Sequence, residues 1–108
     1  MGNSDKLMDQ VKAASARTAE RVWELPLWDD FRDQMKSTIA DLVNSGGRPA
    51  GTAAAGAFLE NFIGDYAWTH IDIAYVDLEP KGGGYTPKGS TGFGVRLLTD
   101  LLSNWKKV

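Results

Sequence analysis

The chain has no cysteine, a single histidine and no long apolar run, and each of these scarcities removes a class of function. Without cysteine there is no disulfide, no thiolate nucleophile and no thiolate metal site. No apolar run approaches the roughly 20 residues that a membrane-spanning helix needs. The first ten residues, MGNSDKLMDQ, also lack the apolar stretch of a secretory signal. We therefore expect a cytoplasmic protein without a membrane partner.

The chain also lacks an excess of positive charge, because 12 Lys and Arg stand against 14 Asp and Glu, a formal net charge of −2. Binding to a phosphate backbone needs clustered Lys and Arg, so we do not expect nucleic acid as a partner. A length of 108 residues allows at most one small domain. Such a chain buries only about two thirds of its unfolded surface, so its core is expected to be modest.

The apolar residues that are present recur mostly at helical spacing. Asn3 or Ser4 suits the cap of a first helix, and Pro26 cannot continue the hydrogen-bond ladder beyond it. Ser90 or Thr91 suits the cap of a last helix. The predicted helices cover residues 3–23, 28–37 and 50–63 and the segment that follows Thr91.

The spacing also predicts which faces of these helices are buried. Residues 38–43 suit either more helix or a short strand, and residues 44–51 are expected to form a loop. The predicted buried faces are Leu7, Val11, Ala14, Thr18 and Val22 in the first helix, and Val95, Leu98, Leu101, Leu102 and Trp105 in the last.

The best strand candidate is WTHIDIAY, residues 68–75, in which Ile71 and Ile73 share one face while His70 and Asp72 share the other. The Gly- and Pro-rich residues 76–92 follow as a long loop, a kind that is often functional. One or two strands do not form a sheet that is stable alone. We therefore predict an α/β fragment, mostly helical, with one or two strands of the sheet of a larger domain. We expect residues 1–108 to form a single partial domain without a separate N-terminal domain.

The residues that could carry chemistry do not assemble into a catalytic set. A metal site needs three or four ligands, and His70 with scattered acids shows no such spacing. Two side chains at i and i+2 of one strand point the same way, so His70 and Asp72 are expected to support structure rather than to form a base pair. Arg48 in the loop GGRPAG is expected to hold two loops by hydrogen bonds, with an anion clamp as the alternative. The glycines of residues 81–94 favour tight turns over a phosphate cradle.

Four blocks in order resemble the C-terminal part of the leucyl (cytosol) aminopeptidases, which are dimetal peptidases. The blocks are ERVWELPLWDDF, KSTIADLVNSGGRPAGTAAAGAFLENF, WTHIDIA and YTPKGSTGFGVRLL, and the match extends from about Gly2 to Leu102. The resemblance implies an α/β catalytic domain to which this region supplies the last strands and helices. It also implies that the metal ligands (a lysine, aspartates and a glutamate) and the block Asn-Thr-Asp-Ala-Glu-Gly-Arg lie in the part upstream of this match.

For this chain the resemblance implies a wall of the pocket that holds the side chain of the substrate's N-terminal residue. Ala74 and Asp77 match pocket positions, while His70, Asp72 and Arg48 would support them. The family usually has glycine after this alanine, and this chain has Tyr75. No cofactor is expected in this chain; the complete enzyme would use two divalent metals (zinc, manganese or magnesium), act on peptides and assemble as a hexamer.

The leading hypothesis is therefore a fragment of a metal-dependent leucyl aminopeptidase that hydrolyses N-terminal residues from peptides. It would need the missing upstream part of the same domain as its partner and would be inactive alone. A second hypothesis is a small stand-alone interaction or assembly module without catalytic activity. A third, an unrelated enzyme that uses His70 as its base, predicts that His70→Ala removes activity without unfolding the chain.

Overall fold

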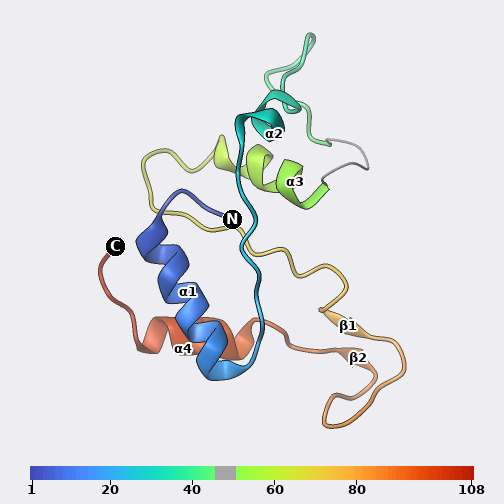
Figure 1. The fold of residues 1–108 in the computed structure, drawn as a ribbon. Helices are drawn as coiled ribbons and strands as arrows, with labels where there is room; N and C mark the ends of the chain where they lie inside the picture. Colours follow the sequence, from blue (N-terminus) through green and yellow to red (C-terminus); the bar gives the residue numbers. More distant parts are fainter. Residues whose placement is uncertain (46–50) are drawn as a thin grey trace. The chain divides into compact units, whose positions relative to one another are not determined.

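The structure is a computed structural model that describes residues 1–45 and 51–108 (Figure 1). As predicted, the described part is mostly helical with a small sheet. It divides into two compact units, one of residues 1–8, 23–71 and 108, and one of residues 9–22 and 72–107. The elements in chain order are α1 (Asp5–Thr18), α2 (Asp29–Asp33), α3 (Gly51–Glu60), β1 (Leu78–Glu79), β2 (Gly89–Ser90) and α4 (Val95–Ser103).

Helix α1 begins as the sequence predicts but ends earlier. The Ser4 hydroxyl accepts a hydrogen bond from the Leu7 N–H at 3.3 Å, which confirms Ser4 as a capping residue. The predicted positions Leu7, Val11 and Ala14 are buried. The helix stops at Thr18 rather than Trp23, because Ala19 adopts a left-handed backbone with φ of 59°. Val22 therefore lies outside the helix, and its N–H donates to the Ser15 hydroxyl at 3.1 Å.

The first unit is organised around α2 and α3, which pack on each other. Their shared core consists of Met35, Ala54 and Ala57, and the small alanines let the two helices approach closely. An ion pair reinforces the contact, since Arg32 Nε donates to Glu60 Oε2 at 2.7 Å and Arg32 Nη2 to Glu60 Oε1 at 3.0 Å. The partly buried side chains packed against the core are Leu27, Phe31, Leu42 and Phe58.

The segment between these helices settles an alternative that the sequence left open. Residues 38–43 form neither helix nor strand, and Val43 returns to the core by donating its N–H to the Met35 carbonyl at 2.8 Å. Helix α3 ends at Glu60, three residues before the predicted end at Ile63. The Asn61 side chain caps it, because its Nδ2 donates to the Ala57 carbonyl at 2.8 Å.

The prediction of a strand at residues 68–75 is wrong. Within the described residues this segment makes one β-bridge, between Thr69 and Gly2. Hydrogen bonds beside the bridge join the His70 N–H to the Met1 carbonyl at 2.8 Å and the Asn3 N–H to the Trp68 carbonyl at 3.2 Å. The pattern of a strand is present, but a strand forms only against a neighbouring strand, and the described part of the chain supplies a single bridge.

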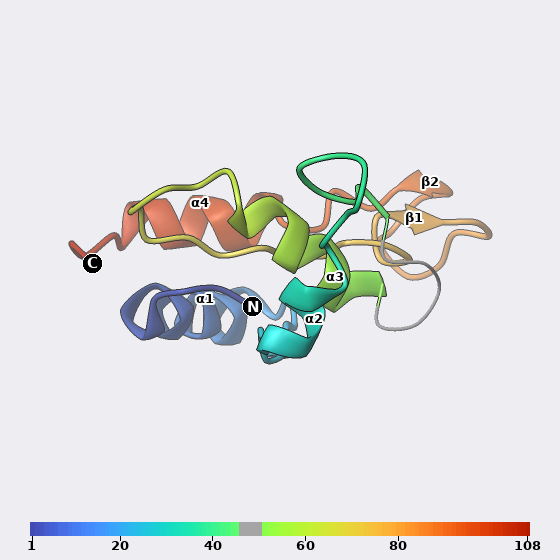
Figure 2. The same cartoon turned by 90° about the horizontal axis from the view of Figure 1, so that it is seen from above.

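The only strands of the described residues lie in the segment predicted to be a loop. Strands β1 and β2 run antiparallel and pair Leu78 with Ser90 and Glu79 with Gly89 (Figures 1 and 2). A further bridge joins residues 83 and 86 nearer the tip. The Gly- and Pro-rich segment is therefore an irregular hairpin, because residues 82 and 84 take the positive φ values that its turns need.

Helix α4 differs from prediction in both its cap and its buried face. Its N-cap is Gly94, with φ of 94°, and not Ser90 or Thr91. The buried residues are Leu97 and Leu101, of which the sequence predicted only the second. The other predicted members of the buried face, Val95, Leu98, Leu102 and Trp105, are exposed.

Candidate functional site

The two predicted pocket residues lie in one tight turn of the second unit. The Ile73 carbonyl accepts the N–H groups of Val76 and Asp77, each at 3.1 Å, which closes the turn. Asp72 fixes its first half, because its Oδ1 accepts the Ala74 N–H at 2.9 Å. The structure thus brings Asp72, Ala74 and Asp77 together, with Ala74 exposed and Asp77 half-buried.

Tyr75 stands at the top of this turn in a conformation that suits glycine. Its φ is 68°, and its side chain is 99% exposed. A left-handed residue with a β-carbon costs about 1–2 kcal/mol. The position at which the resembling family usually has glycine is therefore one whose backbone favours glycine in this chain as well.

Thr91 holds the turn from the opposite side of the hairpin. Its N–H donates to the Asp77 carbonyl at 2.9 Å, and its hydroxyl donates to the Val76 carbonyl at 2.5 Å. The same hydroxyl accepts the Phe93 N–H at 3.1 Å. Sequence reasoning treated Thr91 only as a helix cap, so its role in positioning the turn was missed. The one feature of the sequence that could have indicated this role is the block Ser-Thr-Gly before the last helix.

Glu20 is a buried carboxylate that the sequence analysis did not single out. It is 4% exposed and accepts the N–H groups of Gly94 at 3.1 Å and Leu97 at 2.8 Å, so it caps α4 from 74 residues upstream. Arg96 Nε donates to it at 3.2 Å. Burial raises the pKa of Glu20, but the hydrogen bonds from Leu97, Arg96 and Gly94 outweigh burial and hold that pKa below its ordinary value.

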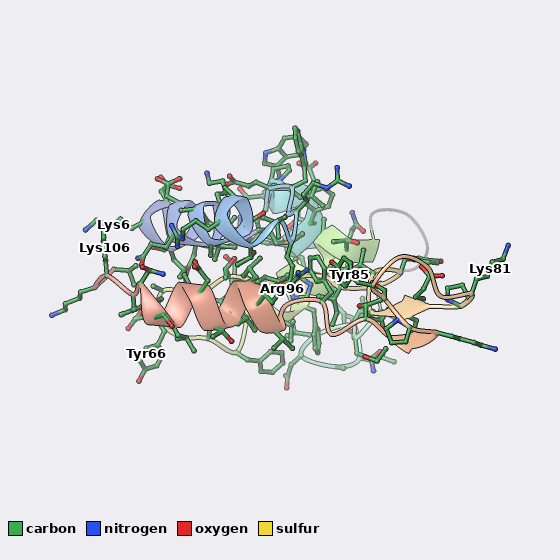
Figure 3. The ribbon with its side chains drawn as sticks, turned by 90° about the horizontal axis from the view of Figure 1, so that it is seen from below. Lys6, Tyr66, Lys81, Tyr85, Arg96 and Lys106 are labelled. Carbon is green, nitrogen blue, oxygen red and sulfur yellow. The ribbon has the colours of Figure 1, made fainter. Side chains whose placement is uncertain are left out.

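Arg96 connects this cap to the hairpin. Its Nη2 donates to the Tyr85 hydroxyl at 3.3 Å, and its guanidinium carbon lies 5.7 Å from the centre of the Tyr85 ring (Figure 3). Hydrogen bonds to Tyr85 and then to Glu20 raise the pKa of Arg96. The arginine therefore stays charged and lies within range of a cation–π contact. Glu20, Arg96 and Tyr85 therefore have structural roles, since each is hydrogen-bonded to another part of the chain.

The remaining predicted site residues lie elsewhere or outside the described residues. His70 belongs to the first unit, where its ring stacks on Trp68 with centroids 6.3 Å apart, whereas Asp72 belongs to the second unit. Arg48 lies outside the described residues. Whether His70 and Arg48 support a pocket therefore stays a prediction.

The described residues contain no centre for metal chemistry. In residues 1–45 and 51–108 no three His, Cys, Asp or Glu side chains gather where they could hold a metal ion. The two metals implied by the resemblance therefore do not fit this set of side chains. In the same residues, no helix has the length and apolar character that crossing a membrane requires. What the second unit offers is a tightly braced turn and hairpin.

Comparison with known proteins gives a consistent result. Residues 1–99 match the model of the cytosol aminopeptidase family, catalytic domain. A probable cytosol aminopeptidase of Syntrophotalea carbinolica is 53% identical over 100 residues, which are 93% of this chain and 20% of that protein. A probable cytosol aminopeptidase of Geobacter sulfurreducens is 51% identical over 102 residues, which are 94% of this chain and 21% of that protein.

Solved structures agree with the sequence relatives. The bottromycin maturation enzyme BotP, solved in complex with Mn, is 37% identical and superposes with a TM-score of 0.87. That match covers 94% of this chain and 23% of BotP. The chain thus spans about a fifth of the length of the curated relatives that it matches.

Proposed function

Because this chain belongs to the cytosol aminopeptidase family, we propose that it forms the C-terminal part of such an enzyme's catalytic domain. One observation carries the proposal: residues 1–99 match the catalytic domain, while the matched relatives are about five times longer. The chain would contribute scaffold and pocket wall, and the remainder of the domain would contribute the metal ligands.

The pocket wall in this proposal is the turn at residues 73–77. Ala74 presents a small methyl group that is exposed, as a surface for an apolar side chain such as leucine requires. Asp72 and Thr91 hold the backbone on either side of it at 2.9 Å and 2.5 Å. His70 and Arg48 would support the neighbouring segments.

The proposed setting follows from the family. The partners would be the rest of the catalytic domain, a peptide substrate and further subunits of a hexamer, in the cytoplasm. The relatives carry the name cytosol aminopeptidase, and BotP is described with Mn, so zinc, manganese or magnesium are the metals to test in the complete enzyme.

The test uses this chain alone and a chimera. In the chimera, the region of the Geobacter sulfurreducens relative that matches this chain is replaced by it. We expect the isolated chain to release no p-nitroaniline from leucine p-nitroanilide and to hold no stoichiometric metal by plasma mass spectrometry. We expect the chimera to hydrolyse the substrate, with the parent protein measured alongside. Ala74→Trp in the chimera should raise KM at least tenfold with little change in kcat.

Three results would contradict the proposal. Turnover by the isolated chain would place the chemistry in its own residues, with His70→Ala as the next variant to test. A folded chimera that is inactive beside an active parent would show that the chain does not supply the wall. A monomeric chain that unfolds cooperatively, combined with an inactive chimera, would favour the stand-alone interaction module.

A further inference from the structure

The apolar side of helix α4 is only partly buried in this chain. At about 100° per residue, Leu97 and Leu101 point to one side and are 0% and 7% exposed. A second apolar stripe lies next to them on the helix. It consists of Val95, Leu98 and Leu102, to which we add Trp105, two residues past the end of the helix. These residues are exposed by 65%, 47%, 69% and 47%, and we name them together the α4 apolar face.

The α4 apolar face is too large and too regular to be incidental. Single exposed apolar residues are normal on a protein surface, but Val95, Leu98 and Leu102 recur at i, i+3 and i+7 of the helix and so form one stripe, which Trp105 follows. Together they expose on the order of 400 Å² of side chain, within the range of patches that serve an interaction. At about 100° per residue, Arg96 and Ser103 lie on the polar side of the helix, away from the centre of this stripe. The stripe itself carries no charge, so it fits an apolar partner.

A second copy of this chain fits the α4 apolar face poorly. A stable interface between proteins buries about 800 Å² on each partner, roughly twice what the face offers. The matched relatives supply a better occupant, because four fifths of their length lies outside the match. The segment at residues 68–75 supports the same occupant. It has the composition of a strand, yet within the described residues its one β-bridge is the bridge of Thr69.

We propose that the α4 apolar face is the surface on which the rest of the aminopeptidase catalytic domain packs, through an apolar layer of its own. This inference rests on the proposed function and adds the contact surface to it. The face is half-formed in this chain, and the remaining part of the domain would complete the burial of α4. Leu102 is the most exposed member of the face. It is therefore the position whose exposure should differ most between the isolated chain and the complete domain.

The experiment compares one substitution in two settings. Leu102→Lys is made in the isolated chain and in the chimera with the Geobacter sulfurreducens relative. Ser103→Lys is the matched control, because it adds the same charge one residue further along, at an exposed position on the polar side. Thermal unfolding, sedimentation and leucine p-nitroanilide hydrolysis are measured for each variant.

In the isolated chain both variants should unfold within about 2 °C of the native chain, because both positions face water. In the chimera, Leu102→Lys should lower the midpoint by at least about 5 °C, since it buries an unpaired ammonium group, while Ser103→Lys should leave it unchanged. If Leu102→Lys unfolds the isolated chain, Val95→Lys at the other end of the face provides the same comparison.

Several outcomes would overturn the inference. Equal midpoints for Leu102→Lys and Ser103→Lys in an active chimera would reject the contact surface and leave the proposed function standing. Self-association of the native chain that Leu102→Lys abolishes would assign the face to a second copy instead. A chimera that fails to fold while its parent folds would reject it too, because the face would not fit the domain. A folded chimera that is inactive but sensitive to Leu102→Lys would reject the pocket wall alone.

Discussion

The Glu20 carboxylate is the group whose removal should reveal most about what holds the second unit together. Helix α4 has glycine as its N-cap residue, with no side-chain cap of its own. Glu20 takes over that role, because one oxygen, Oε2, accepts both the Gly94 and the Leu97 N–H groups. The other oxygen, Oε1, accepts from Arg96. Two substitutions at Glu20 separate these contributions.

Glu20→Ala removes every acceptor and should lower the free energy of unfolding by about 2–3 kcal/mol. That figure joins the loss of a helix cap, about 0.5–2 kcal/mol, with the cost of leaving a buried N–H without a partner, about 1–3 kcal/mol. Glu20→Gln keeps one carbonyl oxygen for the Gly94 and Leu97 N–H groups, and it loses the charge and the hydrogen bond from Arg96, whose place is taken by the amide NH2. Because the Arg96 side chain is 54% exposed, water screens the attraction between the two charges, and Glu20→Gln should cost less than half as much as Glu20→Ala.

Urea unfolding at pH 7, followed by circular dichroism, measures the three free energies. Asp41→Asn is the control, because Asp41 is an exposed carboxylate and should change the midpoint little. The reasoning requires the order Glu20→Ala, then Glu20→Gln, then Arg96→Ala, from most to least destabilising. If Arg96→Ala cost as much as Glu20→Ala, the ion pair and not the helix cap would hold α4, and the reasoning would be refuted.

The same carboxylate predicts a pH dependence. Its pKa in the folded chain lies below the ordinary value of 4.5, so the unfolded chain takes up a proton at higher pH than the folded chain does. The stabilisation is therefore complete above the unfolded pKa and is lost as the pH falls through the folded pKa. Below about pH 4.5, Glu20→Gln should lose less stability on acidification than the native chain.

Two further predictions concern the backbone and the first unit. Ala19→Gly should raise the free energy of unfolding by about 0.5–1 kcal/mol, because its φ of 59° disfavours a β-carbon. The identical change at the exposed helical position Ala13 should lower it by about the same amount, so equal signs in urea unfolding would reject this account. Glu60→Gln should cost roughly 0.5–1 kcal/mol, since its partner Arg32 is 41% exposed. That cost should shrink in 1 M salt, and a salt-independent cost would argue against the ion pair.

Much of the helical part of the fold could be predicted from the sequence, because helices depend on local spacing and caps. The Ser4 cap and the buried face of Leu7, Val11 and Ala14 were correct for that reason. The early end of α1 could not be predicted, because an alanine at position 19 does not indicate a left-handed backbone. Local patterns therefore located the helices but not all of their ends.

The long-range features could not be predicted from local patterns. Glu20 and Leu97 are 77 positions apart, and a lone glutamate beside a helix end is usually solvated, so spacing gives no reason to pair them. Thr91 and Val76 are separated by the hairpin, whose strands lie in a segment too rich in glycine and proline to read as strand. For the candidate site, the sequence indicated Ala74 and Asp77 by resemblance alone. The bonds from Asp72 and Thr91 that hold them became visible only in the fold.

The failed predictions share a physical cause. The apolar spacing of α4 predicted burial at Leu98 and Leu102, and the alternation at residues 68–75 predicted a strand. In the described residues Leu98 and Leu102 are exposed, and the segment 68–75 forms one β-bridge, at Thr69, in place of a strand. Spacing in a sequence reflects every surface that a residue packs against, whereas the structure shows the surfaces supplied by this chain. Both failures are thus what a chain adapted to a larger apolar neighbour would produce, in keeping with relatives five times its length. In the presence of that neighbour, Leu98 and Leu102 should become buried, and the amides of residues 68–75 should together become protected from hydrogen exchange.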